Sequence, residues 1–381
     1  MNTGSVPTSI GIVSLAAVSL TEPDRGFPVG GSELQLYLLA KRLARMGDFR
    51  VTLYVADLGQ PERVEEGIAI RPAVKMQDDL RLTAIRSLRL IRMLARGGHD
   101  IYITRSASGM NGLVRLAARL AGGRHVHMCA HDSECTPTPD ASLSRLAKRL
   151  HRSALRKADL ILCQTPRQVE TLKKFCGRDG KIVPNLLPEA VPPEPAGPRS
   201  GPSTTLRAGA LWVGRDVDWK QPELFLELAR RLPELPFTMV CQPQRGRDLE
   251  RLSSSAPANL RLAPGLPFVE TGQLFGRHKV LLLTSRAEGF PNVLLQAAQA
   301  GTPTVSLCLD PGGRIRRCRA GVVCDGSFDD LVRRTRELLT DAASWRACHE
   351  GALQLAKEME SAGNPIVEIL QSLALGGRGL P

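Results

Sequence analysis

Short apolar runs of strand length alternate with helix-like segments along the whole chain, and no other feature constrains the fold as much. In the first half the runs cover residues 10–18, 51–56, 100–104, 125–130 and 159–163, and in the second half 206–213, 237–241, 280–284 and 304–307. This alternation is typical of parallel sheets with helices on both faces. The sequence therefore predicts an α/β fold.

A proline-rich segment separates the two halves. Residues 184–202 contain seven prolines, and proline fixes φ and lacks an N–H donor, so this segment reads as a stiff linker. A length of 381 residues also suits two domains better than one. We expect a Rossmann-like domain over 1–187, a linker over 188–203, a second Rossmann-like domain over 204–362, and a C-terminal helix and tail over 363–381.

Hydropathy and cysteine usage indicate a cytoplasmic protein. No uninterrupted apolar run is long enough to span a bilayer, and the apolar run near the N-terminus lacks the preceding basic residues of a signal peptide. The nine cysteines are an odd number without a CxxC pair, as expected in a reducing compartment.

The net charge of +13 lies mainly in the first half, where residues 1–200 hold 29 Lys and Arg against 19 Asp and Glu. Two helix-like segments, 81–96 and 142–157, carry much of it, and the first has Leu82, Ile85, Leu88 and Ile91 at helical spacing as its apolar stripe. Such helices can rest on anionic membranes or simply present a solvated face. Aromatic content of 4% and the lack of a recognition motif argue against a nucleic-acid partner.

The segment 281–307 predicts an anion site. A strand ends at Thr284 and Ser285, Gly289 permits a tight loop, Pro291 suits the first helical position, and a helix over 292–300 stops at Gly301. A helix that begins at the carboxyl end of a parallel strand offers free N–H groups and a positive dipole end to a phosphate.

This segment resembles the donor-binding motif of the family 4 retaining glycosyltransferases, which have the GT-B fold of two Rossmann-like domains facing across a cleft. The family commonly has Glu, seven residues and a second Glu; here Glu288 is followed by Gln296, so donor affinity or identity is expected to differ. The segment WVGRDVDWK matches the family's Gly-Arg and Lys spacing with Arg215 and Lys220, and residues 306–313 resemble one branch of the family.

The resemblance implies a role for each matched residue. The donor diphosphate is expected at Arg215, Lys220, Asn292 and Val293. The donor sugar and ribose are expected at Glu288, Gly289, Phe290, Pro291 and Gln296, with Glu288 also counted as catalytic.

Two features of the first half complete the expected site. Gly30 and Gly31 precede a helix expected over 32–46 with Ser32 as its N-cap, and the family has a glycine pair here that faces the donor. His131 follows the strand over 125–130, and the resemblance places it against the reacting sugar. Two alternatives remain open: the glycines could serve only the geometry of the turn, and His131 could be a loop residue that hydrogen-bonds the backbone.

Other readings also remain open. His125, His127, Cys129 and His131 alternate, so one strand face could bind zinc in a hydrolase, and Asp216-Val217-Asp218 spells a DxD. A nucleotide-sugar epimerase would share the fold, whereas no GxGxxG follows any strand as a dehydrogenase would require. We expect a retaining transferase that needs no metal or other cofactor and moves a hexose from a nucleotide-diphosphate sugar to a glycan or lipid-linked acceptor, in polysaccharide or glycoconjugate synthesis, with possible membrane contact.

Overall fold

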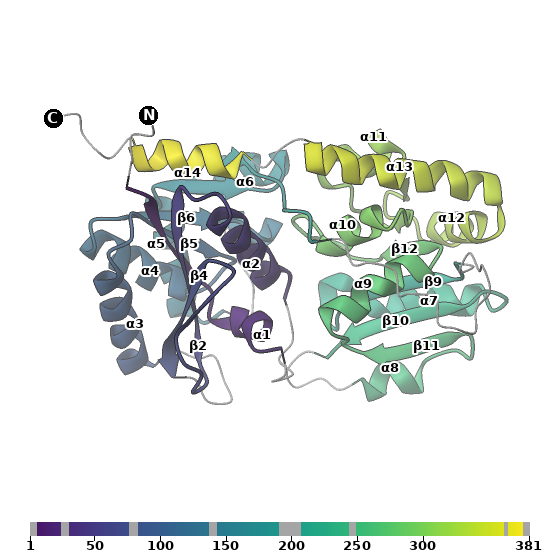
Figure 1. Cartoon of the computed structure of the whole chain (residues 1–381). Helices are drawn as coiled ribbons and strands as arrows, with labels where there is room; N and C mark the ends of the chain where they lie inside the picture. Colours follow the sequence, from purple (N-terminus) through teal and green to yellow (C-terminus); the bar gives the residue numbers. More distant parts are fainter. Residues whose placement is uncertain are drawn as a thin grey trace. The chain divides into compact units, whose positions relative to one another are not determined.

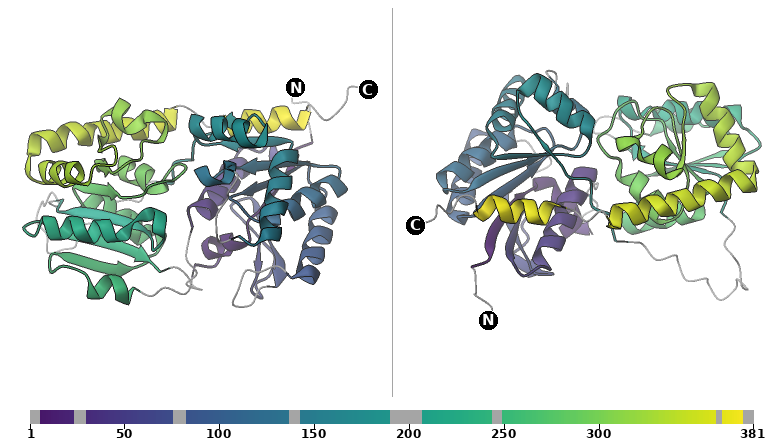
Figure 2. Two further views of the ribbon diagram at one scale, coloured as in Figure 1. Left: turned by 180° about the vertical axis from the view of Figure 1, so that it is seen from behind. Right: turned by 90° about the horizontal axis from the view of Figure 1, so that it is seen from above.

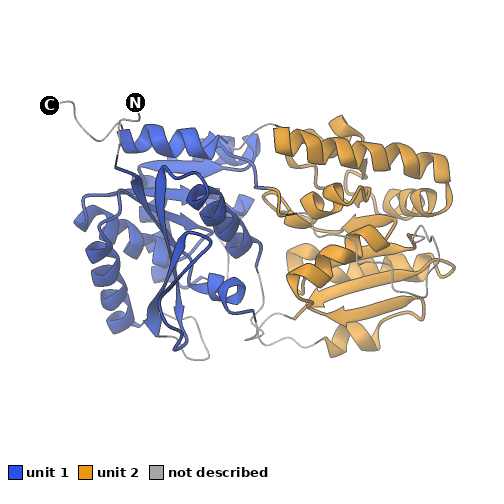
Figure 3. Ribbon diagram, in the orientation of Figure 1, with its two compact units in different colours: residues 1–186, 364–381 blue, residues 187–363 orange. Residues whose placement is uncertain are grey.

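The chain forms two compact units. The computed structural model describes residues 6–23, 30–75, 83–136, 143–189, 207–243, 249–361 and 365–375. Unit 1 comprises residues 1–186 and 364–381, and unit 2 comprises residues 187–363 (Figure 3). Most of the expected linker, residues 190–203, lies outside the described residues, so its stiffness remains a prediction.

Unit 1 is built on an eight-stranded sheet with the order β3-β4-β2-β1-β5-β6-β7-β8 (Figure 1). Its pairs are parallel except β3 with β4. The strands are β1 (Thr8–Val13), β2 (Phe49–Asp57), β3 (Arg63–Glu65), β4 (Ile68–Lys75), β5 (Ile101–Arg105), β6 (Arg124–Met128), β7 (Leu160–Cys163) and β8 (Lys181–Ile182). The helices are η1 (Leu15–Ala17), α1 (Val18–Thr21), α2 (Gly31–Ala44), α3 (Ala84–Gly97), α4 (Met110–Leu120), η3 (Asp132–Cys135), α5 (Arg145–Lys157), α6 (Pro166–Cys176) and α14 (Ile366–Leu375).

Unit 2 contains a six-stranded, all-parallel sheet with the order β11-β10-β9-β12-β13-β14. The strands are β9 (Ala210–Arg215), β10 (Phe237–Gln242), β11 (Leu260–Pro264), β12 (Val280–Leu283), β13 (Thr304–Ser306) and β14 (Gly321–Val323). The helices are η4 (Asp218–Lys220), α7 (Pro222–Arg231), α8 (Glu250–Ser254), α9 (Phe268–Arg277), α10 (Asn292–Gln299), η5 (Pro311–Gly313), α11 (Arg314–Cys318), α12 (Phe328–Thr340) and α13 (Ala342–Ser361). Numbered within the unit, this is the Rossmann order 3-2-1-4-5-6.

The predicted fold class is confirmed, because both sheets carry helices on both faces around aliphatic cores. Residues buried at consecutive strand positions, as in β5 and β12, account for the continuous apolar runs, because helices cover both faces of each sheet. The first run was predicted to be one strand over 10–18, which is wrong after Val13. Beyond Ser14 the chain turns into η1 and α1, whose Leu15 and Val18 pack into the same core and so read as a continuing strand.

Helix α14 follows unit 2 in sequence but packs on unit 1. Ile366, Val367 and Leu370 are buried in the core of unit 1, and Gln371 Nε2 donates a hydrogen bond to Asp48 Oδ2 at 3.1 Å. Figure 2 shows the yellow C-terminal helix against the purple-to-teal strands and helices of unit 1 in both views. The chain therefore crosses between the two units twice.

The apolar stripe predicted for the helix over 81–96 is wrong. Ile85 and Leu88 are 67% and 47% exposed, and the buried positions of α3 are Leu90 and Leu94, while Leu82 lies outside the described residues. Two apolar stripes with similar spacing exist on this helix, and only packing against α4 selects between them. No helix in the described part of the chain is both long and apolar enough to cross a bilayer.

Candidate active site

The sheet order of unit 2 creates a switch point between β9 and β12, where connections leave the sheet in opposite directions. Ligands of open α/β sheets bind at the carboxyl ends of the strands beside such a point. Strand β9 ends at Arg215 and is followed by η4 with Lys220, and the loop after β12 carries Glu288 and leads into α10. The two motifs singled out in the sequence thus meet at one place in unit 2.

Lys220 and Glu288 form an ion pair at this switch point. Lys220 Nζ donates to Glu288 Oε1 at 2.5 Å, and both side chains are 15% exposed. Ser285 Oγ donates to the same carboxylate oxygen at 3.2 Å. Thr284 Oγ1 connects the loops further, because it donates to the Lys220 carbonyl at 2.6 Å and accepts from Trp212 Nε1 at 2.9 Å. The pair is therefore held by side chains from β9 and β12 together.

Gly214 makes room for the Lys220 side chain. A Cβ on this residue would lie 2.8 Å from the Trp212 ring and 3.0 Å from Lys220 Cδ. Neither the buried indole nor the paired lysine can move without disturbing the site. Glycine is needed here for close packing.

Helix α10 begins at Asn292, so Pro291 is its N-cap and not its first residue as predicted. Gly289, Phe290 and Pro291 are buried, whereas Asn292 is half-buried. Val293 and Gln296 are also half-buried, one on each of the first two turns. The first amides of α10 directly follow the loop that carries Glu288, and phosphate binding at these amides stays a prediction.

Arg314 is a further cation beside this helix that the sequence analysis missed. Its guanidinium lies 6.0 Å from the centre of the Phe290 ring, and burial lowers the pKa of Arg314 from its ordinary value. Arg314 follows Gly312 and Gly313, which both have left-handed φ values. The sequence did contain a signal for this turn. The segment 306–313, which resembles one branch of the family, ends in the glycine pair Gly312 and Gly313, and their left-handed backbone turns the chain so that Arg314 lies over Phe290.

Arg215 and the DxD sequence have different surroundings. Arg215 ends β9 and is exposed. Asp216 is completely buried, and its Oδ1 accepts a hydrogen bond from Arg251 Nη2 at 3.1 Å. Asp218 is exposed at the start of η4. The two DxD carboxylates therefore lie in unlike environments, and the buried one already has a cation, so the structure gives them no shared metal geometry.

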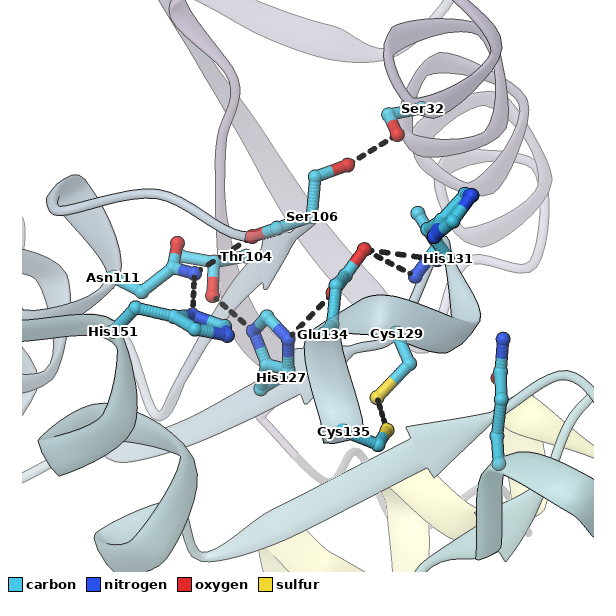
Figure 4. Close-up of polar contacts among 12 residues, drawn as sticks. Ser32, Thr104, Ser106, Asn111, His127, Cys129, His131, Glu134, Cys135 and His151 are labelled. Atoms are coloured by element: carbon cyan, nitrogen blue, oxygen red, sulfur yellow. Dashed lines mark hydrogen bonds and ion pairs between the residues drawn. The ribbon is translucent and has the colours of Figure 1, made fainter. Parts of the chain in front are cut away.

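Unit 1 places polar residues at its own switch point, between β1 and β5. Ser32 and Ser106 are linked through their hydroxyl groups, and Ser106 has a φ of +69°, a left-handed conformation that non-glycine residues rarely adopt (Figure 4). Because Ser32 bonds Ser106, it does not cap α2 as predicted; the N-cap is Gly30. Helix α2 itself begins at Gly31, and a Cβ on Gly30 would meet only the flexible Glu33 carboxylate.

A buried polar chain lies along the carboxyl ends of the later strands, and the sequence analysis missed it. Arg105 Nη2 and Gln164 Nε2 both donate to Asn185 Oδ1, at 2.8 and 2.6 Å. All three are buried, and burial lowers the pKa of Arg105 to about 10. Scattered single residues of this kind give no local sequence signal, because only the sheet brings them together.

His131 is held by the short helix η3. Its Nδ1 accepts from the Ser133 N–H at 3.1 Å, and Glu134 Oε1 accepts the backbone N–H groups of Ala130 and His131 at 3.0 and 2.9 Å. Glu134 is buried; burial alone raises the pKa of its carboxyl, but hydrogen bonding and charge from His127 outweigh this and hold the pKa below its ordinary value. The loop histidine is thus backbone-bonded and fixed in orientation.

The alternating cluster is not arranged as the zinc-hydrolase reading supposed. His125 and His127 both lie against Thr104 Oγ1, at 2.9 and 3.3 Å, while His131 turns to Ser133. Within the described residues, the group with metal-ligand spacing is His127, Cys129 and Glu134, and it is completely buried. A hydrolytic zinc needs an open coordination position, which this interior location does not offer to a substrate.

Both halves match known protein families. Residues 30–185 match the model of the glycosyl transferase 4-like domain, and residues 207–341 match that of the glycosyl transferases group 1. Both units therefore match models from one group of sugar-transferring enzymes, and the segments with the site residues lie inside the matched ranges.

The individual proteins that resemble this chain have low sequence identity to it. A D-inositol 3-phosphate glycosyltransferase 1 from Catenulispora acidiphila is 28% identical over 195 residues, which cover 48% of this chain and 43% of that protein. The match thus spans less than half of the curated relative. Sucrose-phosphate synthase from Thermosynechococcus elongatus has a TM-score of 0.74 at 14% identity, covering 97% of this chain and all of that one. Anabaena HepE, solved with UDP and glucose, has a TM-score of 0.70 at 14% identity, covering 95% and 99%.

These likenesses in fold span nearly the whole chain, and the family matches cover both units. The expected recognition and enzyme class are confirmed. The chain belongs to the group 1, or family 4, glycosyltransferases of the GT-B fold, which transfer a sugar from a nucleotide-sugar donor.

Proposed function

We propose that this chain transfers a hexose with retention of configuration from a nucleotide-diphosphate sugar to a glycan or lipid-linked acceptor. The observation that carries the proposal is the Lys220–Glu288 ion pair at the switch point of unit 2, directly before the start of α10. A cation, a carboxylate and a helix N-terminus at one place match the three parts of such a donor: diphosphate, sugar hydroxyls and leaving group.

In the proposed mechanism, the diphosphate binds at the first amides of α10, those of Asn292 and Val293, with Lys220 and Arg215 as its counter-charges. Lys220 then exchanges its bond to Glu288 for one to a phosphate oxygen, and Glu288 accepts hydrogen bonds from hydroxyls of the sugar. Negative charge that develops on the departing diphosphate is stabilised by groups already in place. Gln296, one turn further along α10, is assigned to the ribose.

Unit 1 supplies the acceptor side of the proposal. His131 lies on a loop fixed by Glu134 and faces the reacting sugar in our assignment. Ser32 and Ser106, with the strained backbone of Ser106, mark the neighbouring edge at which an acceptor hydroxyl binds. The acceptor attacks the face that the diphosphate leaves, and a donor phosphate oxygen accepts its proton, so the anomeric configuration is retained.

A membrane-borne acceptor is favoured by the surface of α3, α4 and α5. Large apolar side chains lie exposed on these neighbouring helices, namely Ile85, Leu88, Leu116, Leu120 and Leu146. Arginines and lysines accompany them on the same helices. Exposed apolar groups among cations are what a peripheral protein presents to anionic lipid. Sedimentation with anionic but not with neutral vesicles tests this part, and equal recovery with both would refute it.

The transfer itself is tested in two steps. A thermal-shift panel of UDP-, GDP- and ADP-sugars identifies the donor, because a ligand of the folded state raises Tm. NMR of the product formed with a lipid or glycan extract then gives the anomeric configuration. Inversion would refute retention, and conversion of the donor without any acceptor would instead establish the epimerase alternative.

A further inference from the structure

Three cysteines from separate elements meet in the interior of unit 1; we call Cys129, Cys135 and Cys163 the thiol cluster. Cys129 follows β6, Cys163 ends the neighbouring strand β7, and Cys135 ends η3. All three are completely buried. The Cys129 and Cys135 sulfurs are 3.6 Å apart, and Cys163 lies in the same buried cluster.

His127 and Glu134 border the thiol cluster. One nitrogen of His127, the Cys129 sulfur and one Glu134 oxygen all lie within 4.8 Å of one another. Figure 4 shows the His127 ring and the Glu134 carboxylate turned toward each other above the two sulfurs of Cys129 and Cys135. Within the described residues, nitrogen, sulfur and oxygen donors thus lie together in the interior of unit 1.

The spacings exclude a disulfide, and they are compatible both with direct hydrogen bonds and with the edges of a tetrahedral metal site. A disulfide needs sulfurs about 2.05 Å apart, far less than the 3.6 Å found here. Two thiolates on zinc, each about 2.3 Å from the metal, lie roughly 3.8 Å apart in a tetrahedron. The 3.3 Å between His127 Nε2 and Glu134 Oε2 likewise equals a nitrogen–oxygen edge of about 3.3 Å in such a site.

The surroundings are those of a supported metal site. Thr104 Oγ1 lies 3.3 Å from His127 Nδ1, so the ring can donate there while Nε2 points to the ion. Glu134 Oε1 is engaged by two backbone N–H groups, which leaves Oε2 for the metal.

We propose that His127, Cys129 and Glu134 hold a structural zinc ion, and that a thiol of Cys135 or Cys163 completes the tetrahedron. The mixed nitrogen, sulfur and oxygen donors suit zinc, and the burial closes the site to substrate. The ion joins β6 and β7 to η3 and so fixes the loop that carries His131. The inference does not depend on the transfer reaction.

Metal analysis and cobalt substitution test the site in the full chain, purified under reducing conditions. We expect one zinc per chain after dialysis against metal-free buffer, and cobalt loading should give the intense visible bands of a tetrahedral ion with a sulfur-to-cobalt charge-transfer band. Cys129→Ser should lose both. Cys176→Ser and Cys308→Ser, which change free cysteines outside the thiol cluster, should retain both.

Cys135→Ser and Cys163→Ser identify the fourth ligand, because one of them should lose the tetrahedral spectrum. Octahedral cobalt bands or no zinc in the wild type, or a disulfide within the thiol cluster, would overturn the proposal. So would a Cys129→Ser variant that binds metal as the wild type does. If that variant fails to fold by circular dichroism, the wild-type spectrum decides alone, because charge transfer requires bound thiolate.

Discussion

Lys220 and Glu288 are 68 positions apart in sequence, yet Nζ and Oε1 are joined at 2.5 Å at the switch point of unit 2. The contact exists because β9 and β12 are adjacent parallel strands whose carboxyl ends share one edge. This half-buried pair holds Lys220 Nζ in place, as the proposed mechanism requires of a group that stabilises a leaving diphosphate.

Replacing Lys220 by Ala should lower kcat by roughly 100- to 1,000-fold, the usual cost of removing one charge-stabilising donor. Lys220→Arg should recover part of the loss, since it retains the charge. Arg231→Ala, which removes an exposed ion pair with Asp329 elsewhere in unit 2, serves as the control and should leave turnover unchanged. Initial rates with the donor found in the thermal-shift panel measure all three; wild-type kcat in Lys220→Ala would exclude the assigned role.

Gly214→Ala should raise the donor KM and reduce stability by about 1–3 kcal/mol, because its new Cβ overlaps the Trp212 ring and displaces Lys220. Gly276→Ala is the matched control. It lies in α9 with open space around the added methyl group, so it should be neutral or stabilise by up to about 1 kcal/mol. Denaturant unfolding followed by tryptophan fluorescence reports on unit 2, which contains all three tryptophans. Equal behaviour of the two variants would contradict the packing argument.

His131→Ala should reduce kcat by about 100-fold or more while donor affinity changes little, since the residue lies in unit 1 and the donor site in unit 2. Ser133→Ala keeps the imidazole and removes the hydroxyl near Nδ1, so it should have a much smaller effect. Separate kcat and KM values distinguish the cases. A change confined to donor KM would place His131 outside the reacting centre.

Gln296→Glu should lower the donor KM a few-fold at unchanged kcat, because a carboxylate bonds ribose hydroxyls more strongly than an amide. The substitution restores the commoner family pattern on the second turn of α10. Titration calorimetry with the nucleoside diphosphate gives the affinity directly. Weaker binding in the variant would show that position 296 faces the diphosphate and not the ribose.

Acid should destabilise unit 1 through His99. Burial, then the positive charges of Arg71 and Arg50 against the opposing Asp100, lowers the pKa of His99 to about 4 from 6.5. Tyr54 and Ser9 hydrogen-bond its two ring nitrogens at 2.8 Å each. The folded state binds this proton less readily than the unfolded state. The contribution of neutral His99 to the free energy of unfolding is therefore complete above pH 6.5 and is lost as the pH falls toward 4. The loss amounts to roughly 3 kcal/mol.

The measurement uses near-ultraviolet circular dichroism of tyrosine, since all three tyrosines lie in unit 1 and report its unfolding separately from unit 2. His99→Gln should weaken the dependence between pH 6.5 and 4 without abolishing it, because burial also lowers the pKa of His151 to about 4 and that of His125 to about 3 in the same unit. A wild-type midpoint that is constant over this range would show that His99 titrates normally in the fold.

The sequence predicted the strands and helices of both sheets best where local pattern determines them. The strand, loop and helix around Glu288 follow from a buried run, a glycine and a proline in order, and the structure departs there by one residue at Pro291. The strand β4 and the edge strands β3, β8, β11 and β14 were not predicted, because their side chains lack a continuous buried apolar pattern.

Packing decides what local pattern cannot. The outward direction of Ile85, the bond between Ser32 and Ser106, and the position of Arg314 over Phe290 all depend on residues from distant segments. The thiol cluster is similar, since strand alternation alone suggested His131 as the partner of His127, whereas the turn into η3 supplies Glu134 and Cys135 instead. Such choices depend on long-range contacts that a one-dimensional pattern does not contain.

The position of α14 in the sequence also determines when the core of unit 1 can be completed during translation. The hydrophobic patch of unit 1 that receives Ile366 and Leu370 is synthesised early, yet it stays uncovered until the whole of unit 2 has been translated. The strands of unit 1 are all made before unit 2, but its core is complete only once α14 has been synthesised, after the whole of unit 2.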